Sequence, residues 1–398
     1  MGKRSRRRIL IIVENLPVPF DRRVWQEATT LHKAGCEVSV ICPAGKGYKL
    51  GHEVIDGIHV YRHPLPFEAS GALGYLLEYS VALFWEFLFA WRVFLTRGFD
   101  VIHACNPPDT IFLIGGFFKL FKKKFIFDHH DINPELYEAK FGRRDMFYRV
   151  LRALERWTFK TADVSIATNE SYRRIAIERG KMKAENVFVV RSGPDLERLR
   201  ILSPVEALKK GRPHLVGYVG VMGQQEGIDY LLRAAKILTN DMCRQDVHFG
   251  LVGGGTELED MKRYAAELGI ADYVTFTGRV SDQEMLEMLN TADVCVNPDV
   301  ANEMNDKSTM NKIMEYMALG KPIVQFALTE GWYSARDASL YAAKNDELDF
   351  ARKIAELLDD PARRTKMGQF GRARVESELE WSHQVPKLLA AYAKVFAM

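Results

Sequence analysis

The stretch VGYVGVMGQQEG, residues 216–227, decides the fold expected of this chain. A short apolar run comes first, then a turn that contains three glycines, and then the apolar periodicity of a helix over 228–239. A strand that passes through a glycine turn into a helix is the repeating unit of parallel α/β sheets. Such a turn often receives a phosphate group, because glycine lets backbone amides approach an anion and a helix N-terminus attracts it. This turn holds no Lys and no Arg, so the countercharge has to come from elsewhere.

The same alternation continues in both directions along the chain. Strands are expected at 9–14, 37–42, 100–105, 124–129, 163–168 and 187–191, and again at 214–220, 247–252, 273–277, 293–297 and 322–326. Mostly apolar runs between helical patterns predict parallel sheets covered on both faces. The fold class is therefore α/β, with two doubly wound, Rossmann-like domains that face each other across a cleft.

The length supports two domains as well. The 398 residues exceed the ~250 to 300 at which one hydrophobic core usually stops growing. We expect an N-terminal domain over 1–192, a C-terminal domain over 193–375, and a final helix within 376–398. The SGPD turn at 192–195 is the expected hinge. In the second half, Thr256 with Glu259 and Ser281 with Glu284 have the spacing of capping boxes at helix starts.

Composition points to a soluble, cytoplasmic protein. Apolar residues make up 47% of the chain and charged residues 27%, and the net charge of +3 says little about partners. The five cysteines form no C-x-x-C pair, which favours free thiols in a reducing compartment over a disulfide framework or a zinc site. The basic start leads into ILIIVENLPVP, which lacks the long apolar segment and cleavage site of a signal peptide.

One segment suggests contact with a membrane. Residues 72–95 are apolar enough for a span, but Glu78, Glu86 and Arg92 interrupt them at intervals too short for one. We expect a long helix that is either buried between elements or dipped into a bilayer surface. The segment FFKLFKKKF, 117–125, combines aromatic and basic residues in a way that suits the same anionic surface. The alternatives are burial in the fold and, for this run and GKRSRRR at 2–8, ordinary solvation.

Loops that follow the strands of the second half carry the candidate binding residues. They are GVMGQQEG (220–227), GGGT (253–256), GRVS (278–281) and the long segment 297–322. Any one could be no more than a tight turn, but four loops that converge at the carboxyl ends of parallel strands predict a nucleotide site. In the last loop, Lys307, Ser308, Thr309, Asn311 and Lys312 crowd a helix start and Glu315 follows. Lys312 and Glu315 would lie on the same helical face, where the cation suits a phosphate and the carboxylate suits ribose hydroxyls. The alternative is that the two residues form a surface ion pair.

Four stretches resemble a known family. KSTMNKIMEYMALGKPIV, 307–324, resembles the donor-site signature of retaining glycosyltransferases of family 4, which have the GT-B fold. ENLPVPFDRRVWQEATTLHKAGCEVSVICP, 14–43, resembles the opening of a bacterial and archaeal subgroup that makes surface polysaccharides. DVIHACNPPD (100–109) and DHHDINPE (128–135) resemble motifs of its N-terminal domain. The resemblance covers nearly the whole chain.

This resemblance implies a mechanism and roles for residues. The C-terminal domain is expected to hold a nucleotide-sugar donor, usually UDP-linked, and the N-terminal domain the acceptor. The sugar is transferred with retention by a front-face mechanism, in which the leaving phosphate helps to deprotonate the incoming hydroxyl. Glu315 matches the glutamate that holds the ribose, and His130 the histidine that approaches the transferred sugar. The final helix is expected to cross back to the first domain.

The chain also departs from the family pattern. Val221 and Glu226 stand where many members have Arg and Lys, and Lys307 stands where they have a first glutamate. We therefore expect the backbone amides of 222–227 and of the 308–311 helix start to cradle the diphosphate. Lys307 and Lys312 supply the charge, and Asp306 replaces the missing carboxylate. The predicted catalytic residues are His130, Lys312 and Asp306; the predicted donor-binding residues are Gly220, Met222, Gly223, Arg279, Lys307, Ser308, Thr309 and Glu315.

On the acceptor side, Asp21, Arg22 and Arg23 begin the first helix and could meet an anionic acceptor, although Asp21 is also a plausible helix N-cap. His103 and Asp131 are predicted to line this side as well. His103 and His129 stand at strand ends, where histidines are commonly structural. No Asp-x-Asp motif stands at a strand end, so neither a metal nor a cofactor beyond the nucleotide-sugar co-substrate is expected.

Three functions remain open at this point. The first is a retaining, metal-independent glycosyltransferase that builds a polysaccharide or other glycan on a lipid-linked or saccharide acceptor, at the inner face of the cell membrane. The second is a nucleotide-sugar epimerase of the same fold, which needs no acceptor. The third is a non-catalytic nucleotide-sugar-binding protein, suggested by Val221, Glu226 and Lys307. No nucleic-acid partner is expected.

Overall fold

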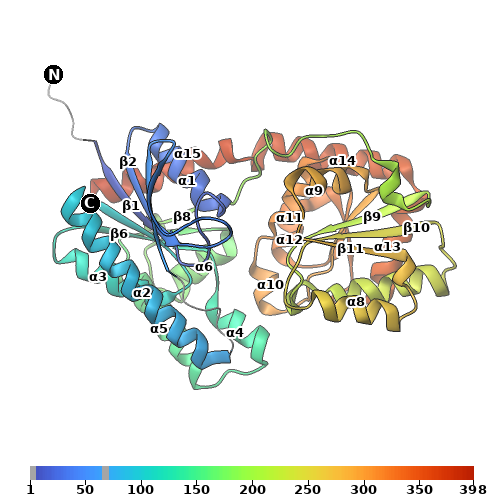
Figure 1. The fold of residues 1–398 in the computed structure, drawn as a ribbon, viewed down its shortest axis with the longest axis horizontal. Helices are drawn as coiled ribbons and strands as arrows, with labels where there is room; N and C mark the ends of the chain where they lie inside the picture. The colour runs from blue at the N-terminus through green and yellow to red at the C-terminus, as the bar shows by residue number, and fades with distance from the viewer. Residues whose placement is uncertain (1–5, 65–70) are drawn as a thin grey trace. The chain divides into compact units, whose positions relative to one another are not determined.

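A computed structural model describes residues 6–64 and 71–398, apart from the side chains of 71–73 and 75–77 (Figure 1). Residues 2–5 of the basic N-terminal run lie outside the described residues. The chain divides into two compact units, one made of Met1–Ser192 with Gln384–Met398 and the other of Gly193–His383. The division falls at the start of the SGPD turn.

The first unit is built on an eight-stranded sheet in the described part of the chain. Its order is β3-β4-β2-β1-β5-β6-β7-β8, and all neighbours are parallel except β3 and β4. The strands are β1 (Arg8–Ile12), β2 (Glu37–Pro43), β3 (Gly51–Ile55), β4 (Ile58–His63), β5 (Val101–Cys105), β6 (Lys124–His129), β7 (Val164–Ala167) and β8 (Val187–Val189). The central strands are buried along almost their whole length, as the apolar runs predict.

Helices cover both faces of this sheet (Figure 1). They are α1 (Arg22–Lys33), α2 (Gly71–Thr96), α3 (Phe112–Lys119), α4 (Asn133–Phe141), α5 (Met146–Thr161), α6 (Glu170–Glu178) and most of α15 (Trp381–Ala397). Asp21 is the N-cap of α1, and its side chain accepts a hydrogen bond from the Val24 amide. The final helix packs on the first unit, where Gln384 accepts a hydrogen bond from the Arg191 amide.

The long helix α2 has one buried face, and its exposed face carries apolar side chains together with Ser80 and Arg92. Ala82, Glu86 and Ala90 recur every four residues and are fully buried. Glu86, which interrupts the apolar segment in the sequence, therefore lies on the buried face of the helix. Phe84 and Leu88 also lie one helical turn apart and are 58% and 41% exposed. By length and composition, Glu78–Thr96 could cross a membrane, and 22% of that stretch is buried within the chain.

The second unit repeats the architecture with six strands in its described residues. The order is β11-β10-β9-β12-β13-β14, all parallel. The strands are β9 (His214–Val219), β10 (Val247–Val252), β11 (Val274–Gly278), β12 (Val294–Asn297), β13 (Ile323–Phe326) and β14 (Ser339–Ala342). The α-helices are α7 (Ile228–Lys236), α8 (Leu258–Glu267), α9 (Asp282–Thr291), α10 (Glu303–Lys307), α11 (Asn311–Ala318), α12 (Thr329–Ala335), α13 (Glu347–Asp359) and α14 (Pro361–Arg374).

In the described residues, strand prediction missed β3 and β14, which stand at sheet edges, and β4, which lies between β3 and β2. β3 is mostly exposed, so it lacks the apolar run by which the other strands were found. The turn between β3 and β4 is Asp56-Gly57, with φ of 50° and 81°. Positive φ at both central residues is typical of the tight hairpin turn that favours Asp-Gly, and this dipeptide could have revealed the hairpin.

One predicted capping box forms and the other does not. Ser281 accepts from the Glu284 amide, and the Glu284 carboxylate accepts from the Ser281 amide. At α8 the expected Thr256 box is wrong, because the helix starts one residue later, with Glu257 as its N-cap. The Glu257 amide donates to the carbonyl of Met222 instead, so contact with the β9 loop sets this helix start.

Candidate functional site

The loops at the carboxyl ends of β9, β10, β11 and β12 are joined to one another. The Met222 amide in the first loop donates to the carbonyl of Gly254 in the second at 3.0 Å. The Val300 amide in the fourth loop donates to the carbonyl of Gln225 in the first at 3.0 Å, and another bond of 3.0 Å links the second loop to the end of β11. The expected convergence of the four loops is confirmed, and it lies at the sheet edge where α/β folds bind ligands.

Two glycines make this packing possible. Gly253 has a φ of 135°, and a side chain there would collide with the backbone of Gly220. Gly227 has a φ of 60°, and a side chain there would collide with the carbonyl of Pro298 in the fourth loop. Glycine at both positions therefore lets one loop lie directly on another.

The same packing uses amides that were expected to cradle a phosphate. The Met222 side chain is fully buried and its amide is bonded to the second loop, while the Gly220 amide donates to the Val252 carbonyl at 3.0 Å. The Glu226 amide donates to the Gly223 carbonyl at 3.2 Å. The expectation of a cradle is therefore wrong for the amides of Met222 and Glu226, because loop packing already uses them.

Lys312 is the most enclosed cation of these loops. It stands in the first turn of α11, and its Nζ lies 2.7 Å from Oδ1 of Asp299 in the loop after β12. The side chains are 12% and 2% exposed, and Nζ also lies 5.1 Å from the centroid of the Tyr218 ring. Burial raises the pKa of Asp299, and Lys312 opposes that rise. The two side chains form a preorganised ion pair at the convergence of the loops, with the Lys312 ammonium as its cation.

Glu226 belongs to the same electrostatic cluster. Burial raises the pKa of its carboxyl, Asp299 raises it further, and Lys312 lowers it. Val221, the other departure from the family pattern, is 62% exposed. A carboxyl with a raised pKa takes up a proton readily, and a neutral carboxyl can donate a hydrogen bond to an anion. Glu226 is therefore less unfavourable to a diphosphate than its formal charge suggests.

A short helix that the sequence did not predict precedes the helix start expected at 308–311. Asn302 caps a short helix, α10, by accepting from the Asn305 amide, and this helix ends at Lys307. Lys307 is 28% exposed, and its Nζ lies 2.6 Å from the carboxylate of Glu303. Lys307 thus lies at a helix C-terminus and is paired with an acid, which corrects its expected place beside the helix start.

Asp306 and Ser308 are also engaged within the unit. Oδ1 of Asp306 lies 3.0 Å from the ammonium of Lys344, and Oδ2 accepts from the Thr329 hydroxyl at 2.8 Å. The Ser308 hydroxyl donates to the Met304 carbonyl at 2.8 Å. Asp306 therefore links α10 to the start of α12. A role toward sugar hydroxyls requires it to exchange these partners.

Glu315 has a cationic partner that sequence reasoning missed. Its Oε1 lies 2.6 Å from Nη2 of Arg198, and the two side chains are 18% and 20% exposed. The residues are 117 positions apart, so no local pattern signals the pair. Thr309 lies between α10 and α11, and Arg279 is an exposed residue directly after β11.

In the first unit, Arg23 is the centre of a buried polar cluster. Its Nη2 lies 3.1 Å from both Asp128 Oδ1 and Glu27 Oε1, and its Nε lies 2.9 Å from Nε2 of His130. Burial by itself would raise the pKa of Asp128, but Arg23 and His130 hold it well below its usual range. Burial and the neighbouring Asp128 raise the pKa of Glu27. Arg23 thus stabilises Asp128 from within the fold, and the expectation that it meets an acceptor anion is wrong; Arg22 is exposed.

Asp128 orients two histidines. Nε2 of His103 lies 3.2 Å from Oδ2 of Asp128, and Nδ1 lies 2.7 Å from the hydroxyl of Tyr392 in α15. Because Asp128 is ionised, the proton of His103 sits on Nε2 and Nδ1 accepts from the tyrosine. Burial lowers the pKa of His103, in keeping with a neutral ring. His103 is fully buried and contacts Asp128, so in this structure it does not line the acceptor side directly.

His130 is the member of this cluster that reaches solvent. Its side chain is 16% exposed, and Nε2 lies 2.6 Å from Oδ2 of Asp128. One ring nitrogen cannot donate to Asp128 and also accept from Arg23, and the ionised carboxylate favours the proton on Nε2. Nδ1 is then the ring nitrogen left to accept a hydrogen bond from a ligand. Asn106 Oδ1 accepts from the amides of His130 at 2.7 Å and Asp131 at 3.1 Å, which fixes this loop.

His129 has the structural role that is common for a histidine at a strand end. It is fully buried and packs against the rings of Phe127, Phe159 and Tyr172. Burial and the nearby Arg179 lower the pKa of His129 to about 3.

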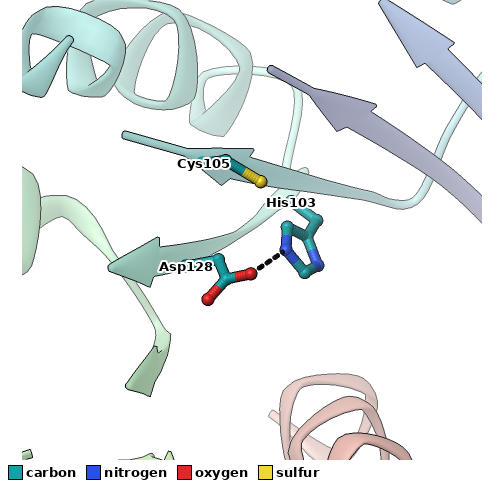
Figure 2. A group of neighbouring side chains, drawn as sticks. All are labelled: His103, Cys105 and Asp128. Carbon is teal, nitrogen blue, oxygen red and sulfur yellow. Dashed lines mark hydrogen bonds and ion pairs between the residues drawn. The ribbon is translucent and has the colours of Figure 1, made fainter. Parts of the chain in front are cut away.

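Among the described residues, two groups of side chains have ligand atoms close enough to hold a metal: His103, Cys105 and Asp128, and Glu27, Asp128 and His130. Figure 2 shows His103 directed at Asp128 and Cys105 beside them. Neither group fits a metal well. Burial raises the pKa of Cys105, which keeps the thiol protonated, and both nitrogens of His103 are already bonded. In the second group, the guanidinium of Arg23 already takes the place of a cation.

The two units, each a doubly wound parallel sheet, define the class of protein, and solved structures share the fold. Sucrose-phosphate synthase from Thermosynechococcus elongatus matches with a TM-score of 0.80 and 20% identity over 98% of this chain and 100% of that one. HepE of Anabaena in complex with UDP matches with a TM-score of 0.73 and 15% identity over 97% and 99%. The fold is that of the GT-B glycosyltransferases.

Sequence comparison then identifies the family. Residues 21–198 match the model described as Glycosyltransferase Family 4, and residues 213–360 match the one described as Glycosyl transferases group 1. The chain belongs to glycosyltransferase family 4. A 2-deoxystreptamine glucosyltransferase of Streptomyces kanamyceticus is 28% identical over 260 residues, 62% of this chain and 64% of that protein. The alignments span less than two thirds of the curated relatives they match.

Proposed function

We propose that this protein is a retaining glycosyltransferase that moves a sugar from a UDP-sugar to a lipid-linked or saccharide acceptor during glycan biosynthesis. The observation that carries the proposal is the buried Lys312–Asp299 pair at the point where the four loops of the second unit converge. A fixed cation at this sheet edge is suited to the charge that develops on a leaving diphosphate, because preorganised charges need no reorganisation during the reaction. Membership of a glycosyltransferase family supports this interpretation of the site.

On the donor side, Lys312 neutralises the diphosphate and Glu226 takes up a proton when the donor binds. Glu315, held by Arg198, accepts from the ribose hydroxyls. UDP is the proposed nucleotide because HepE, a structural neighbour, was solved with UDP. Transfer is proposed to need no metal, with the leaving phosphate assisting deprotonation of the acceptor hydroxyl on the same face.

On the acceptor side, His130 is the proposed catalytic residue. Nδ1 of its ring can accept a proton while Asp128 holds Nε2, and Asp128 is kept ionised by Arg23. A histidine so oriented can position and polarise an acceptor hydroxyl. Asp131 follows on the same loop, held by Asn106, and is proposed to contact the acceptor.

Peripheral membrane contact is proposed for the outer face of α2 and the end of α3. Phe84, Leu95 and Leu120 are 58%, 69% and 78% exposed, and Trp91 on α2 packs on Phe121 with ring centroids 5.7 Å apart. Basic residues of the 117–125 segment adjoin this surface: the ammonium of Lys123 lies 5.5 Å from the centroid of the Phe94 ring in α2. Exposed apolar side chains beside lysines are typical of a surface that binds anionic lipid. The proposed location is thus cytoplasmic, at the inner face of the cell membrane.

The test is incubation of the purified chain with UDP-, GDP- and ADP-sugars, with and without a membrane lipid extract. Release of UDP with a glycosylated product whose anomeric configuration matches that of the donor supports the proposal. Isomerised donor without transfer would instead indicate an epimerase, and donor binding without turnover in every mixture would indicate a binding protein. Full turnover after dialysis against a chelator is expected, and a loss of turnover restored by Mg²⁺ would contradict the metal-free mechanism.

A further inference from the structure

The first unit contains an apolar pocket that the proposed chemistry does not use. It lies among α2, α4, α5 and the loop after β5, and its volume is about 180 Å³. Most of its lining is apolar, with Leu83, Leu136, Phe141, Phe147, Val150 and Leu154 among the lining residues. An apolar cavity of roughly 150 Å³ is large enough to admit benzene. The pocket is therefore large enough for a short stretch of aliphatic chain.

Polar residues connect this pocket to the His130 loop. Asp109 and Asn133 line the pocket, and Asn133 donates to Oδ2 of Asp109 at 2.8 Å. The amide of Asn106 donates to Oδ1 of the same carboxylate at 2.9 Å, and its oxygen accepts from the His130 amide. One hydrogen-bonded chain thus runs from the pocket wall to the proposed catalytic histidine. The pocket wall and the His130 loop are therefore joined through Asp109 and Asn106.

Lys140 places a cation where the pocket meets solvent. Lys140 lines the pocket and is exposed, and its charge acts on the carboxyl of Asp131, the residue after His130. Phe141, Phe147 and Val150 also line the pocket and are 39%, 37% and 45% exposed, so the apolar wall continues to the surface. An apolar space with a lysine at its mouth complements an aliphatic chain that ends in an anionic group.

We propose that this pocket binds the aliphatic chain next to the phosphate of a lipid-linked acceptor. The chain lies between α2, α4 and α5, and the phosphate faces Lys140. The sugar or hydroxyl to be glycosylated is thereby directed toward His130. This proposal rests on the proposed function and narrows its acceptor from a lipid-linked or saccharide compound to a lipid-linked one.

The pocket is tested by calorimetric titration of the full chain with butyl phosphate and with decyl phosphate, in the absence of donor and of vesicles. Decyl phosphate is expected to bind at least about tenfold more tightly, a ratio equivalent to about 1.4 kcal/mol. Two substitutions act on the pocket in different ways: Val150→Glu places a charge at its mouth, and Leu83→Trp fills it. Leu120→Glu is the matched control, because Leu120 is 78% exposed on the neighbouring surface and does not line the pocket.

Both pocket variants are expected to lose the preference for the longer chain, whereas Leu120→Glu keeps it. Lys140→Gln is expected to weaken the binding of both phosphates by the same factor and to leave the preference for decyl phosphate unchanged. Equal binding of the two phosphates to the unchanged protein would overturn the proposal, as would equal loss in Leu120→Glu, which would indicate adsorption to the outer surface. Displacement of decyl phosphate by dihexanoyl phosphatidylglycerol at similar concentration would assign the pocket to bulk lipid and also overturn it. If the protein prefers decyl phosphate but transfers no sugar, the proposal for the pocket stands and only the proposed function is refuted.

Discussion

Replacing Lys312 with methionine tests whether the buried pair at the loops is structural, catalytic or both. Lys312 and Asp299 are 12% and 2% exposed, so the substitution leaves a carboxylate buried without its cation. Breaking a buried pair at one end typically costs about 3 to 5 kcal/mol of stability. Removal of a cation from the first turn of α11 returns about 0.3 to 1 kcal/mol through the helix dipole. The net loss expected for Lys312→Met is therefore about 2 to 5 kcal/mol at neutral pH.

The pH dependence gives a second signature. Burial already raises the pKa of Asp299, and loss of Lys312 raises it further. A carboxyl whose pKa is higher in the folded state binds its proton more tightly there, so stability falls as pH rises through that pKa. Urea unfolding followed by circular dichroism should therefore show a deficit in Lys312→Met that shrinks at acidic pH. Asp299→Asn in the same chain should restore most of the stability at neutral pH.

Turnover separates the two roles. If Lys312 stabilises the leaving diphosphate, the stable double variant Lys312→Met with Asp299→Asn should remain slow. Charge-assisted hydrogen bonds contribute about 1.5 to 3 kcal/mol, which corresponds to roughly 10- to 150-fold in rate. The loss should appear in kcat more than in donor binding. Wild-type stability of Lys312→Met at neutral pH would refute the buried pair, and near-normal kcat in the double variant would refute its catalytic role.

Glu226→Gln should tighten donor binding at alkaline pH and make donor binding less dependent on pH. The reason is that burial raises the pKa of this carboxyl, so the carboxyl takes up a proton when the anionic donor binds. A donor dissociation constant that rises as steeply with pH in the variant as in the unchanged protein would contradict this. Tyr392→Phe removes the donor to a buried histidine and should cost about 1 to 3 kcal/mol in urea unfolding, whereas an unchanged midpoint would show that the bond contributes nothing. Lys122→Glu with Lys123→Glu should weaken flotation with anionic vesicles by at least roughly tenfold, while Lys262→Glu in the other unit should leave it intact. An equal loss of flotation in both variants would show that the net charge of the protein alone determines vesicle binding.

The sequence by itself determined the two α/β units and the edges at which their sites lie. Hydrophobic runs between helical patterns are local, and they report burial on both faces for most strands inside a sheet; β4 has no such run and was missed. The helix starts at Asp21 and Ser281 were also predictable, because a cap bonds to amides two or three residues away. The glycine loops were predicted to converge for the same reason, since the carboxyl ends of parallel strands share one edge.

Only the tertiary structure decided which charges meet. Arg23 reaches Asp128 across 105 positions, and Glu315 reaches Arg198 across 117, so no local spacing reports either pair. The final helix supplies Tyr392 to His103 across 289 positions. At Thr256 a local capping signal was overridden, because the β9 loop takes the neighbouring amide. Periodicity fixes which face of an element is buried, whereas the partner of a buried charge depends on the packing of elements far apart in the chain.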